Sequence, residues 1–510
     1  MPHVSRFPRR GRTLSTWAVV AALGLSAGLA GCSDDDPPGD LGKRPEPSAS
    51  QPAPAPNAPN VLLITADDMS IDDVAHMPAL QALIADQGVT LTDGLAPTPL
   101  CVPARASLLT GQYAINHGAR TIKGRTGGPK AVRQPQRTLP VWLQGAGYDT
   151  LFVGKYLNGY GLKDPTHIPA GWSDWRASID DSTYSFTETE FNANGRIVKP
   201  EGYSTDIIAE MSRESLEARD TSRPFYMWVN YVAPHIGGPR ESDDPSTVFA
   251  DDPDAQLSTT MPAEKYRNTM SDQELPDVPE MWRGTKGSLW FLPDHSANYK
   301  AAMREVNQQR LESLRSVDDA IASTVAELKK QGVLRDTYII VTSDNGFMVG
   351  HNNRMGKVLP YDNSLRIPIL LRGPGLPKGT KSDLPVTNPD LAATIASLAG
   401  AKPNRPIDGT DVMPDLLKQR TGQRPIPISA WPVKGGRVPM YTGIRYGSYT
   451  YVVPTHGPEE LYDRSVDPGE SRNLAKGPRY RAVLKQLRAW EAEYRNCSGD
   501  TCPKEFQKLS

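Results

Sequence analysis

The segment from Cys101 to Gly111 places a cysteine, a proline and an arginine at alternate positions, as Cys101, Pro103 and Arg105, ahead of Ser-Leu-Leu-Thr-Gly. Pro103 suits the first turn of a helix, where its missing N–H is not needed. The cysteine then lies at a helix N-terminus, where free N–H groups and the helix dipole favour negative charge. Arg105 follows one turn later and can hold the group that Cys101 presents. A lone cysteine is more often a small buried apolar residue, so the spacing alone leaves both interpretations open.

Two pairs of oxygen-bearing side chains follow apolar runs elsewhere in the chain. Asp67 and Asp68 come shortly after residues 60–65, and Asp344 and Asn345 come after residues 338–342. Parallel strands end at one edge of a sheet, where sites of open α/β sheets gather, so we expect the pairs to meet. Their oxygens suit Ca²⁺ or Mg²⁺ better than zinc or copper. Each pair alone would be better explained as a helix N-cap or an Asx turn, and it is the occurrence of two such pairs that favours a metal site.

The stretch from Cys101 to Gly111 resembles the signature of the sulfatase family, in which Cys-x-Pro-x-Arg is the site that the formylglycine-generating enzyme recognises. The resemblance extends over residues 59–475 and implies an alkaline-phosphatase-like fold. It implies that Cys101 is converted to formylglycine (3-oxoalanine), whose hydrate attacks the sulfur of a sulfate ester. It also implies that one divalent ion, usually Ca²⁺ with Mg²⁺ as the alternative, is bound by Asp67, Asp68, Asp344 and Asn345.

Further motifs imply the cationic groups of such a site. They are Gly154-Lys155, Ala233-Pro234-His235, and Gly350-His351 followed by Lys357. By this resemblance Lys155, His235 and Lys357 act in catalysis together with Arg105. Lysines can neutralise the sulfate oxygens, where charge remains in the transition state. His351 is assigned to substrate binding.

One position departs from the common pattern. Many sulfatases carry a histidine two residues after the first lysine, where this chain has Leu157. The variant Gly-Lys-Tyr-Leu-Asn over residues 154–158 resembles the branch of N-acetylglucosamine-6-sulfatases and extracellular heparan 6-O-sulfatases. That resemblance implies a sulfated amino sugar, such as glucosamine 6-sulfate, as substrate, and an aryl sulfate is the alternative. His117 either supplies the missing imidazole at the substrate or is a structural histidine. Loops within residues 160–200 and 236–295 are expected to select the substrate.

Two other functions fit the same motifs. A phosphonate or phosphodiester hydrolase can use the same modified residue and fold, and a surface lipoprotein can bind sulfated glycans without hydrolysing them. A net charge of −1, from 57 basic and 58 acidic residues, argues against a nucleic-acid partner. With 8 histidines and no Asp-x-His-x-x-His pattern, the chain does not fit a two-zinc phosphatase of related fold.

These residues require a scaffold of alternating strands and helices. Buried strands are predicted over residues 60–65, 151–155, 225–231, 338–342 and 367–371, and helices over 77–87 and within 299–331. This alternation is typical of an α/β fold with a mostly parallel central sheet and helices on both faces. From residue 425 onward, a smaller α+β subdomain is predicted. It comprises short antiparallel strands at 445–446, 449–453 and 461–462 and a helix over 480–494. The catalytic domain is accordingly assigned to 59–424 and the subdomain to 425–510.

The first 58 residues read as targeting and tethering segments. Residues 1–32 have a basic start, an apolar stretch and the sequence Leu-Ala-Gly-Cys, which resembles a bacterial lipobox. We therefore expect export, lipidation of Cys32 and anchoring to the outer face of the cell membrane; an ordinary secretory signal is the alternative. Residues 33–58, rich in Pro, Ala and Ser, are expected to be a disordered tether. Export would permit a disulfide between Cys497 and Cys502, with two free thiols as the alternative.

Overall fold

The computed structural model describes residues 51–244, 257–292 and 294–509. The predicted signal segment 1–32, its lipidation site Cys32 and most of the predicted tether lie outside the described residues. Within the described ranges, we find no helix that combines the length and the apolar character needed to cross a lipid bilayer.

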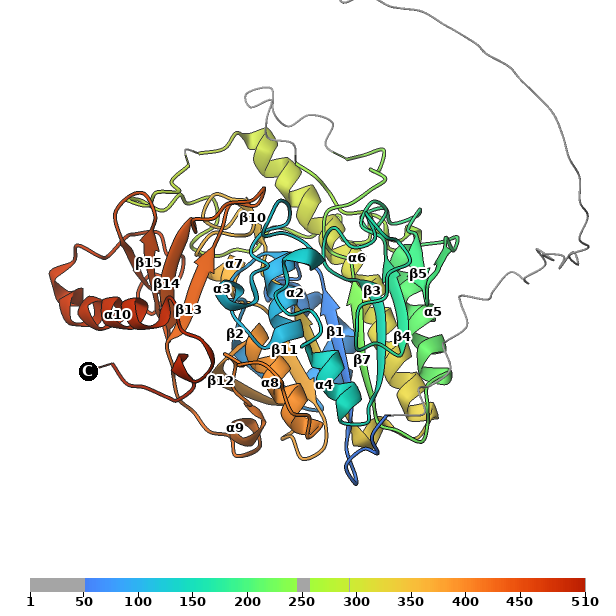
Figure 1. The fold of residues 1–510 in the computed structure, drawn as a ribbon. Coiled ribbons are helices and arrows are strands. Elements are labelled where there is room, and N and C mark those ends of the chain that lie inside the picture. The colour runs from blue at the N-terminus through green and yellow to red at the C-terminus, as the bar shows by residue number, and fades with distance from the viewer. Residues whose placement is uncertain (1–50, 245–256, 293, 510) are drawn as a thin grey trace, which may run out of the picture. The chain divides into compact units, whose positions relative to one another are not determined.

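A ten-stranded sheet forms the centre of the described residues (Figure 1). The strands lie in the order β12 (Thr380–Thr387), β2 (Val89–Leu95), β11 (Ile369–Arg372), β8 (Thr337–Ser343), β1 (Asn60–Ala66), β7 (Phe225–Tyr231), β3 (Asp149–Lys155), β4 (Asp174–Ser178), β5 (Phe191–Ala193) and β6 (Arg196–Val198). The strands from β8 to β4 in this order pair in parallel, and antiparallel pairs flank them. The predicted α/β fold with a mostly parallel sheet is confirmed.

Helices cover both faces of this sheet. On one face lie α2 (Cys101–Thr110), α4 (Leu139–Gly145) and α8 (Asn388–Leu398); on the other lie α5 (Ser204–Glu217) and α6 (Ala297–Lys330). Successive residues of a strand point to opposite faces. In β1, Leu63 therefore packs with the first group of helices and Leu62 with the second. A continuous apolar strand is what such two-sided burial requires.

A second, smaller sheet follows near the C-terminus (Figure 1). It is antiparallel, in the order β13 (Ile426–Ala430), β14 (Tyr441–Tyr446), β15 (Tyr449–Pro454) and β16 (Glu460–Asp463). Helix α10 (Arg481–Tyr494) packs on it through Leu484, Leu487 and Trp490. The expected antiparallel strands and final helix are present, while the boundary at residue 425 stays a prediction.

The helix predicted over 77–87 is shorter and less regular than expected. Helix α1 (Pro78–Leu80) continues into a π-helical turn (Gln81–Ala85) and ends before Gly88. A Cβ at Gly88 would lie 1.9 Å from the carbonyl oxygen of Leu371 in β11, so the helix has to end before Gly88, where the chain enters the sheet beside β11. Packing against the sheet therefore overrides the helical pattern at this end.

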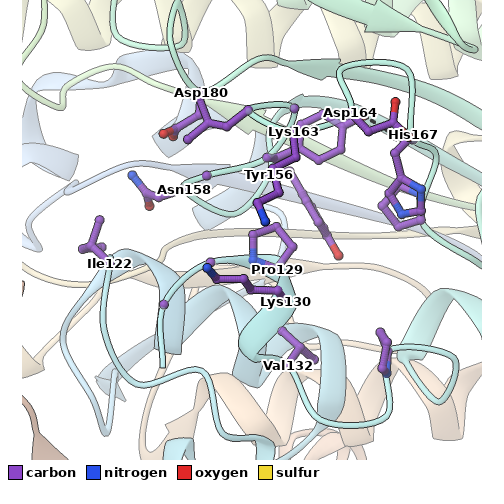
Figure 2. A pocket seen from close by; sticks show the side chains of 18 of the residues that line it. Ile122, Pro129, Lys130, Val132, Tyr156, Asn158, Lys163, Asp164, His167 and Asp180 are labelled. Atoms are coloured by element: carbon purple, nitrogen blue, oxygen red, sulfur yellow. Dashed lines mark hydrogen bonds between the residues drawn. The ribbon is translucent and has the colours of Figure 1, made fainter. Parts of the chain in front are cut away.

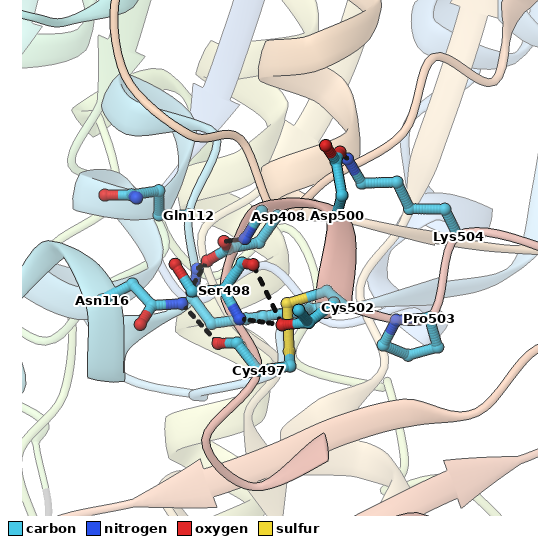
Figure 3. Close-up of a disulfide and its surroundings, with 12 residues drawn as sticks. Gln112, Asn116, Asp408, Cys497, Ser498, Asp500, Cys502, Pro503 and Lys504 are labelled. Atoms are coloured by element: carbon cyan, nitrogen blue, oxygen red, sulfur yellow. Dashed lines mark hydrogen bonds and ion pairs between the residues drawn. A yellow bond between two sulfur atoms is a disulfide. The ribbon is translucent and has the colours of Figure 1, made fainter. Parts of the chain in front are cut away.

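The Cys497–Cys502 disulfide closes a short turn in the C-terminal tail, and hydrogen bonds hold this turn against the main body (Figure 3). The Asp408 carboxylate accepts hydrogen bonds from Gly499 N (2.7 Å) and from Asn116 Nδ2 (2.8 Å), and Asn116 also donates to the Cys497 carbonyl oxygen (2.7 Å). Asn116 belongs to α3 (Ala114–His117), which directly follows the signature helix α2. The bridged turn thus contacts the segment next to Cys101's helix.

Replacing both bridged cysteines by serine is expected to lower the free energy of unfolding by about 2 kcal/mol, because the bridge closes a short loop and removes unfolded-state entropy. Turnover of a sulfate ester should not change. Denaturant unfolding of the double variant and of the wild type, with and without reductant, measures this. An unfolding free energy equal to that of the oxidised wild type would contradict a stabilising role.

Candidate active site

The two oxygen-bearing pairs meet at the carboxyl edge of the sheet. Strands β1 and β8 are paired in parallel with Ala66 opposite Ser343, so the residues that follow them are brought together. Asp68 N donates to Asp344 Oδ1 (3.2 Å), and Asn345 Nδ2 donates to Asp68 Oδ1 (2.6 Å). Asp67 completes the group, and all four side chains are buried. The register of the parallel strands produces the cluster that the sequence predicted.

This cluster has the character of a cation site. Three of its oxygens are buried and have no hydrogen-bond partner among the described residues: Asp67 Oδ1, Asp68 Oδ2 and Asn345 Oδ1. Ligand atoms of Asp67, Asp68, Cys101 and His235 lie within 4.8 Å of one another. Burying unpaired carboxylate oxygens is costly unless a cation compensates them. Carboxylate and amide oxygens are the donors that hard divalent cations prefer, so the residues present fit such an ion.

Helix α2 places Cys101 next to this cluster of oxygen-bearing side chains. Its N-cap, Leu100, is extended, and Cys101 is the first helical residue, 2% exposed. The Cys101 Sγ lies 2.9 Å from Lys357 Nζ. Burial raises the pKa of the thiol, and the Asp67 carboxylate adds to this effect, against the opposing charges of Lys155 and Lys357. An unmodified Cys101 is therefore held as the neutral thiol, a poor nucleophile.

Arg105 fixes the helix to several strand ends at once. Its Nε donates to Asp344 Oδ2 (2.8 Å), and its Nη1 donates to Asn230 Oδ1 (2.8 Å) and to the Lys155 carbonyl oxygen (2.9 Å). These acceptors follow or belong to β8, β7 and β3. Arg105 is itself only 1% exposed. The guanidinium fork thus positions α2 relative to the sheet edge.

Two lysines reach the cluster from different parts of the fold. Lys155, the last residue of β3, pairs with Asp67. Lys357, which follows β10 (Met355–Gly356), pairs with Asp68. Burial by itself raises the pKa of Asp67, but nearby cations, Lys155 foremost, outweigh it and lower the pKa. The predicted cations and carboxylates therefore form one compact, charged site.

His235 is the imidazole of this cluster. Its Nδ1 lies 2.7 Å from the Ile236 carbonyl oxygen, to which it can only donate, which leaves Nε2 as the acceptor in the neutral ring. Nε2 faces Asp68 Oδ2 at 3.6 Å. Burial lowers the pKa of His235 despite the nearby carboxylates. The ring is thus held neutral, with a free nitrogen turned toward the site.

His117 and His351 are not brought to this cluster. His117 is fully buried; its Nδ1 accepts from Ala119 N (3.2 Å) and its Nε2 lies 3.2 Å from Ser107 Oγ. Burial lowers the pKa of His117 to about 3. Nε2 thus joins α3 to α2, and Nδ1 holds the turn that follows α3. This arrangement matches the structural alternative and not the substrate-binding one.

His351 has surroundings of its own. Its Nδ1 accepts from Val349 N (3.3 Å), and its Nε2 faces Asp72 Oδ2 at 3.9 Å. Burial lowers its pKa to about 4. These contacts give no support to the predicted role in substrate binding.

Three further side chains support the site and were not predicted. Asn230 holds Arg105, as described above. The Tyr184 ring lies 4.8 Å from Lys155 Nζ and its centroid 4.6 Å from that of His235. Arg310, fully buried in α6, donates to the Asp68 carbonyl oxygen (2.7 Å) and pairs with Asp73 (2.9 Å). Of these three residues, only Asn230 could have been predicted from the sequence. It lies at the end of a predicted strand, where the residues of a site gather.

Comparison with known proteins gives consistent similarities. The sulfatase family model matches residues 59–401, and the model of the C-terminal region of N-sulphoglucosamine sulphohydrolase matches residues 350–496. An arylsulfatase of Volvox carteri is 31% identical over 88% of this chain and 76% of its own length. An N-acetylglucosamine-6-sulfatase of Capra hircus is 33% identical over 70% of this chain and 63% of its own.

A solved structure described as a complex with its substrate D-glucosamine-2-N,6-O-disulfate has a similar fold. Its TM-score is 0.71, at 21% identity over 86% of this chain and 97% of that one. At this identity the likeness concerns the fold alone.

Proposed function

Because this chain belongs to the sulfatase family and is thus a sulfuric ester hydrolase, we propose that it releases sulfate from the 6-position of a sulfated glucosamine, with a formylglycine made from Cys101 as nucleophile. The observation that carries the proposal is the position of Cys101. Its Sγ lies 2.9 Å from Lys357 and within 4.8 Å of ligand atoms from Asp67, Asp68 and His235. The choice of sugar is supported by residues 154–158 and by the N-acetylglucosamine-6-sulfatase relatives.

The modified side chain supplies two geminal hydroxyls. One gives its proton to Asp344 and attacks sulfur, and deprotonation of the other expels sulfate as the carbonyl re-forms. The chain's own residues orient these groups. Arg105 holds the start of α2 against the sheet edge through Asp344 and Asn230. Lys357 Nζ, already in contact with the side chain of residue 101, remains beside the attacking oxygen.

The basic side chains around Cys101 stabilise negative charge and transfer protons. Lys155 and Lys357 neutralise the sulfate oxygens, and Lys357 is the proton donor to the leaving alcohol. His235, neutral and with Nε2 free, accepts the proton of the second hydroxyl. In this assignment His235 is the base of the elimination step, although Leu157 occupies the position where many sulfatases have a histidine.

A divalent ion would be the partner of the buried oxygens that these cations leave without a hydrogen bond. Asp67, Asp68, Asp344 and Asn345 would hold it, and we propose Ca²⁺ because the donors are all oxygens. When bound, such an ion would supply positive charge to the reaction at sulfur.

The test is the mass of the peptide containing Cys101, from protein purified from its own host, together with sulfate release from glucosamine 6-sulfate. A peptide with formylglycine or its hydrate, and release from the sugar, are expected. Unmodified cysteine at full occupancy would overturn the nucleophile. Faster turnover of an aryl phosphodiester than of any sulfate ester would instead favour a phosphodiester hydrolase. Binding of sulfated sugar without any release would favour a glycan-binding protein.

A further inference from the structure

A cavity of about 700 Å³ opens beside the end of β3, outside the cluster around Cys101 (Figure 2). Two segments enclose most of it, residues 122–138 and residues 156–172. Its volume lies in the range of pockets that take small organic ligands. None of the catalytic or metal-binding residues described above lines this cavity.

The cavity shares a wall with the active site. Asn158 lines it, three residues after Lys155, and donates from Nδ2 to the Tyr184 hydroxyl (2.5 Å). The ring of Tyr184 in turn contacts Lys155 and His235. Tyr184 therefore connects the Asn158 side of the cavity with the cationic side of the active site.

Two buried polar atoms in the cavity lining lack partners. Asn158 Oδ1 and Trp172 Nε1 have no hydrogen-bond partner among the described residues, although their side chains are only 7% and 8% exposed. Leaving a buried donor or acceptor unpaired costs about 1–3 kcal/mol. An acceptor and a donor on one wall suit the hydroxyl groups of a sugar, and the neighbouring rings of Tyr156 and Tyr160 offer apolar surface.

Both segments contribute lysines to the lining of the cavity. Lys123 and Lys130 come from one, and Lys163 comes from the other. Figure 2 shows Lys130 and Lys163 extending into the space between the segments. The opposing carboxylates are Asp164, whose Oδ1 accepts from Thr166 N (3.1 Å) and Thr166 Oγ1 (2.8 Å), and the partly buried Asp180. Asp180 lies close to Lys123 and Lys155, so Lys130 and Lys163 are the amino groups that face the cavity without a nearby carboxylate partner among the described residues.

From this combination we propose that the cavity is a second sugar subsite, which takes an anionic unit of an oligosaccharide whose sulfated glucosamine lies at Cys101. The anion is a sulfate or a uronic carboxylate held by Lys130 and Lys163, and Asn158 and Trp172 bind sugar hydroxyls. The inference rests on the proposed function, which it deepens from a sulfated sugar to an acidic glycan chain.

The test compares a heparin-derived tetrasaccharide with glucosamine 6-sulfate as substrates. For the double variant Lys130→Ala/Lys163→Ala, the ratio of kcat/KM for the tetrasaccharide to that for the monosaccharide should fall about tenfold, mostly through KM, since two charge contacts are lost. The matched control Lys402→Ala/Lys485→Ala removes two exposed lysines elsewhere and should keep the wild-type ratio. A ratio equal to wild type in the Lys130/Lys163 variant would overturn the proposal.

A binding measurement separates this inference from the proposed function. In a Cys101→Ala background, calorimetry with the tetrasaccharide should show weaker binding when Lys130 and Lys163 are removed, even if the wild type releases no sulfate from any ester. The same comparison is then made with a fully desulfated tetrasaccharide that keeps its uronates. If removal of Lys130 and Lys163 weakens its binding by the same factor, the bound anion is the carboxylate. If its binding does not change, the bound anion is the sulfate. Trp172→Phe, which keeps a ring but loses the N–H, should weaken binding severalfold. Equal affinity of all variants for the sulfated probe would exclude the subsite.

Discussion

Replacing Cys101 by serine is expected to lower steady-state sulfate release by about 10⁴-fold or more, as losses of catalytic nucleophiles do. The serine hydroxyl is close in size to the thiol and can remain beside Lys357, so the fold should persist. A single hydroxyl can accept a sulfuryl group, but it cannot expel sulfate by re-forming a carbonyl. We therefore expect at most one turnover and a protein that carries one covalent sulfate.

Rapid-mixing measurement of sulfate release and the intact mass of the protein check this result. The double variant Cys497→Ser/Cys502→Ser is the matched control, since it makes the same substitution away from the site and should keep full turnover. Wild-type steady-state turnover by Cys101→Ser would exclude Cys101 as the source of the nucleophile.

Removal of divalent ions is expected to lower turnover by a factor of about 100 or more, in keeping with the share of transition-state stabilisation that a catalytic ion supplies. Asp67, Asp68 and Asn345 would then each keep one buried oxygen without a ligand, although Lys155 and Lys357 still neutralise the two carboxylates. Calcium should restore turnover. At a calcium concentration 100 times the Kd, binding adds about 2.7 kcal/mol to the free energy of unfolding, which raises the thermal midpoint.

The variant Asn345→Ala tests whether this effect belongs to the cluster. It removes an uncharged donor whose Oδ1 is unpaired, and should weaken calcium binding and the calcium-dependent rise in midpoint together. The control Asn298→Ala removes the same side chain from an exposed position at the start of α6 and should behave as wild type. A chelated wild type with full activity, or equal calcium responses in both variants, would contradict a metal site at these residues.

The carboxylates of this site can be predicted from the sequence because their positions depend only on the pairing of two parallel strands. Asp67 and Asp344 are 277 positions apart, yet each follows an apolar run, and parallel pairing of β1 with β8 is sufficient to join them. The start of α2 was predictable for a similar local reason, because Pro103 is tolerated only near a helix N-terminus.

Residues whose roles depend on packing between distant elements were missed. Arg310 lies within a long helix rich in charged residues, where an arginine usually faces solvent, yet it is buried against Asp68 and Asp73. Tyr184 lies in an irregular segment between strands β4 and β5, without periodicity. Strand β2 was not predicted, and it contains Asp93 and Gly94, two residue types that are uncommon in strands. A Cβ at Gly94 would lie 2.6 Å from the Ile367 carbonyl oxygen, a requirement visible only in three dimensions.

The near-complete burial of Cys101 and Arg105 has a consequence for the order of events in the life of the chain. The segment that a maturation enzyme would have to grip is 1–2% exposed at both residues and is packed under the edge of the sheet. A catalyst of comparable size cannot reach it in the folded protein, so we expect oxidation of Cys101 to occur on the nascent or unfolded chain. Maturation and folding then compete in time. A chain that folds first keeps its thiol, stable but inactive, and the active fraction of a preparation records which process was faster.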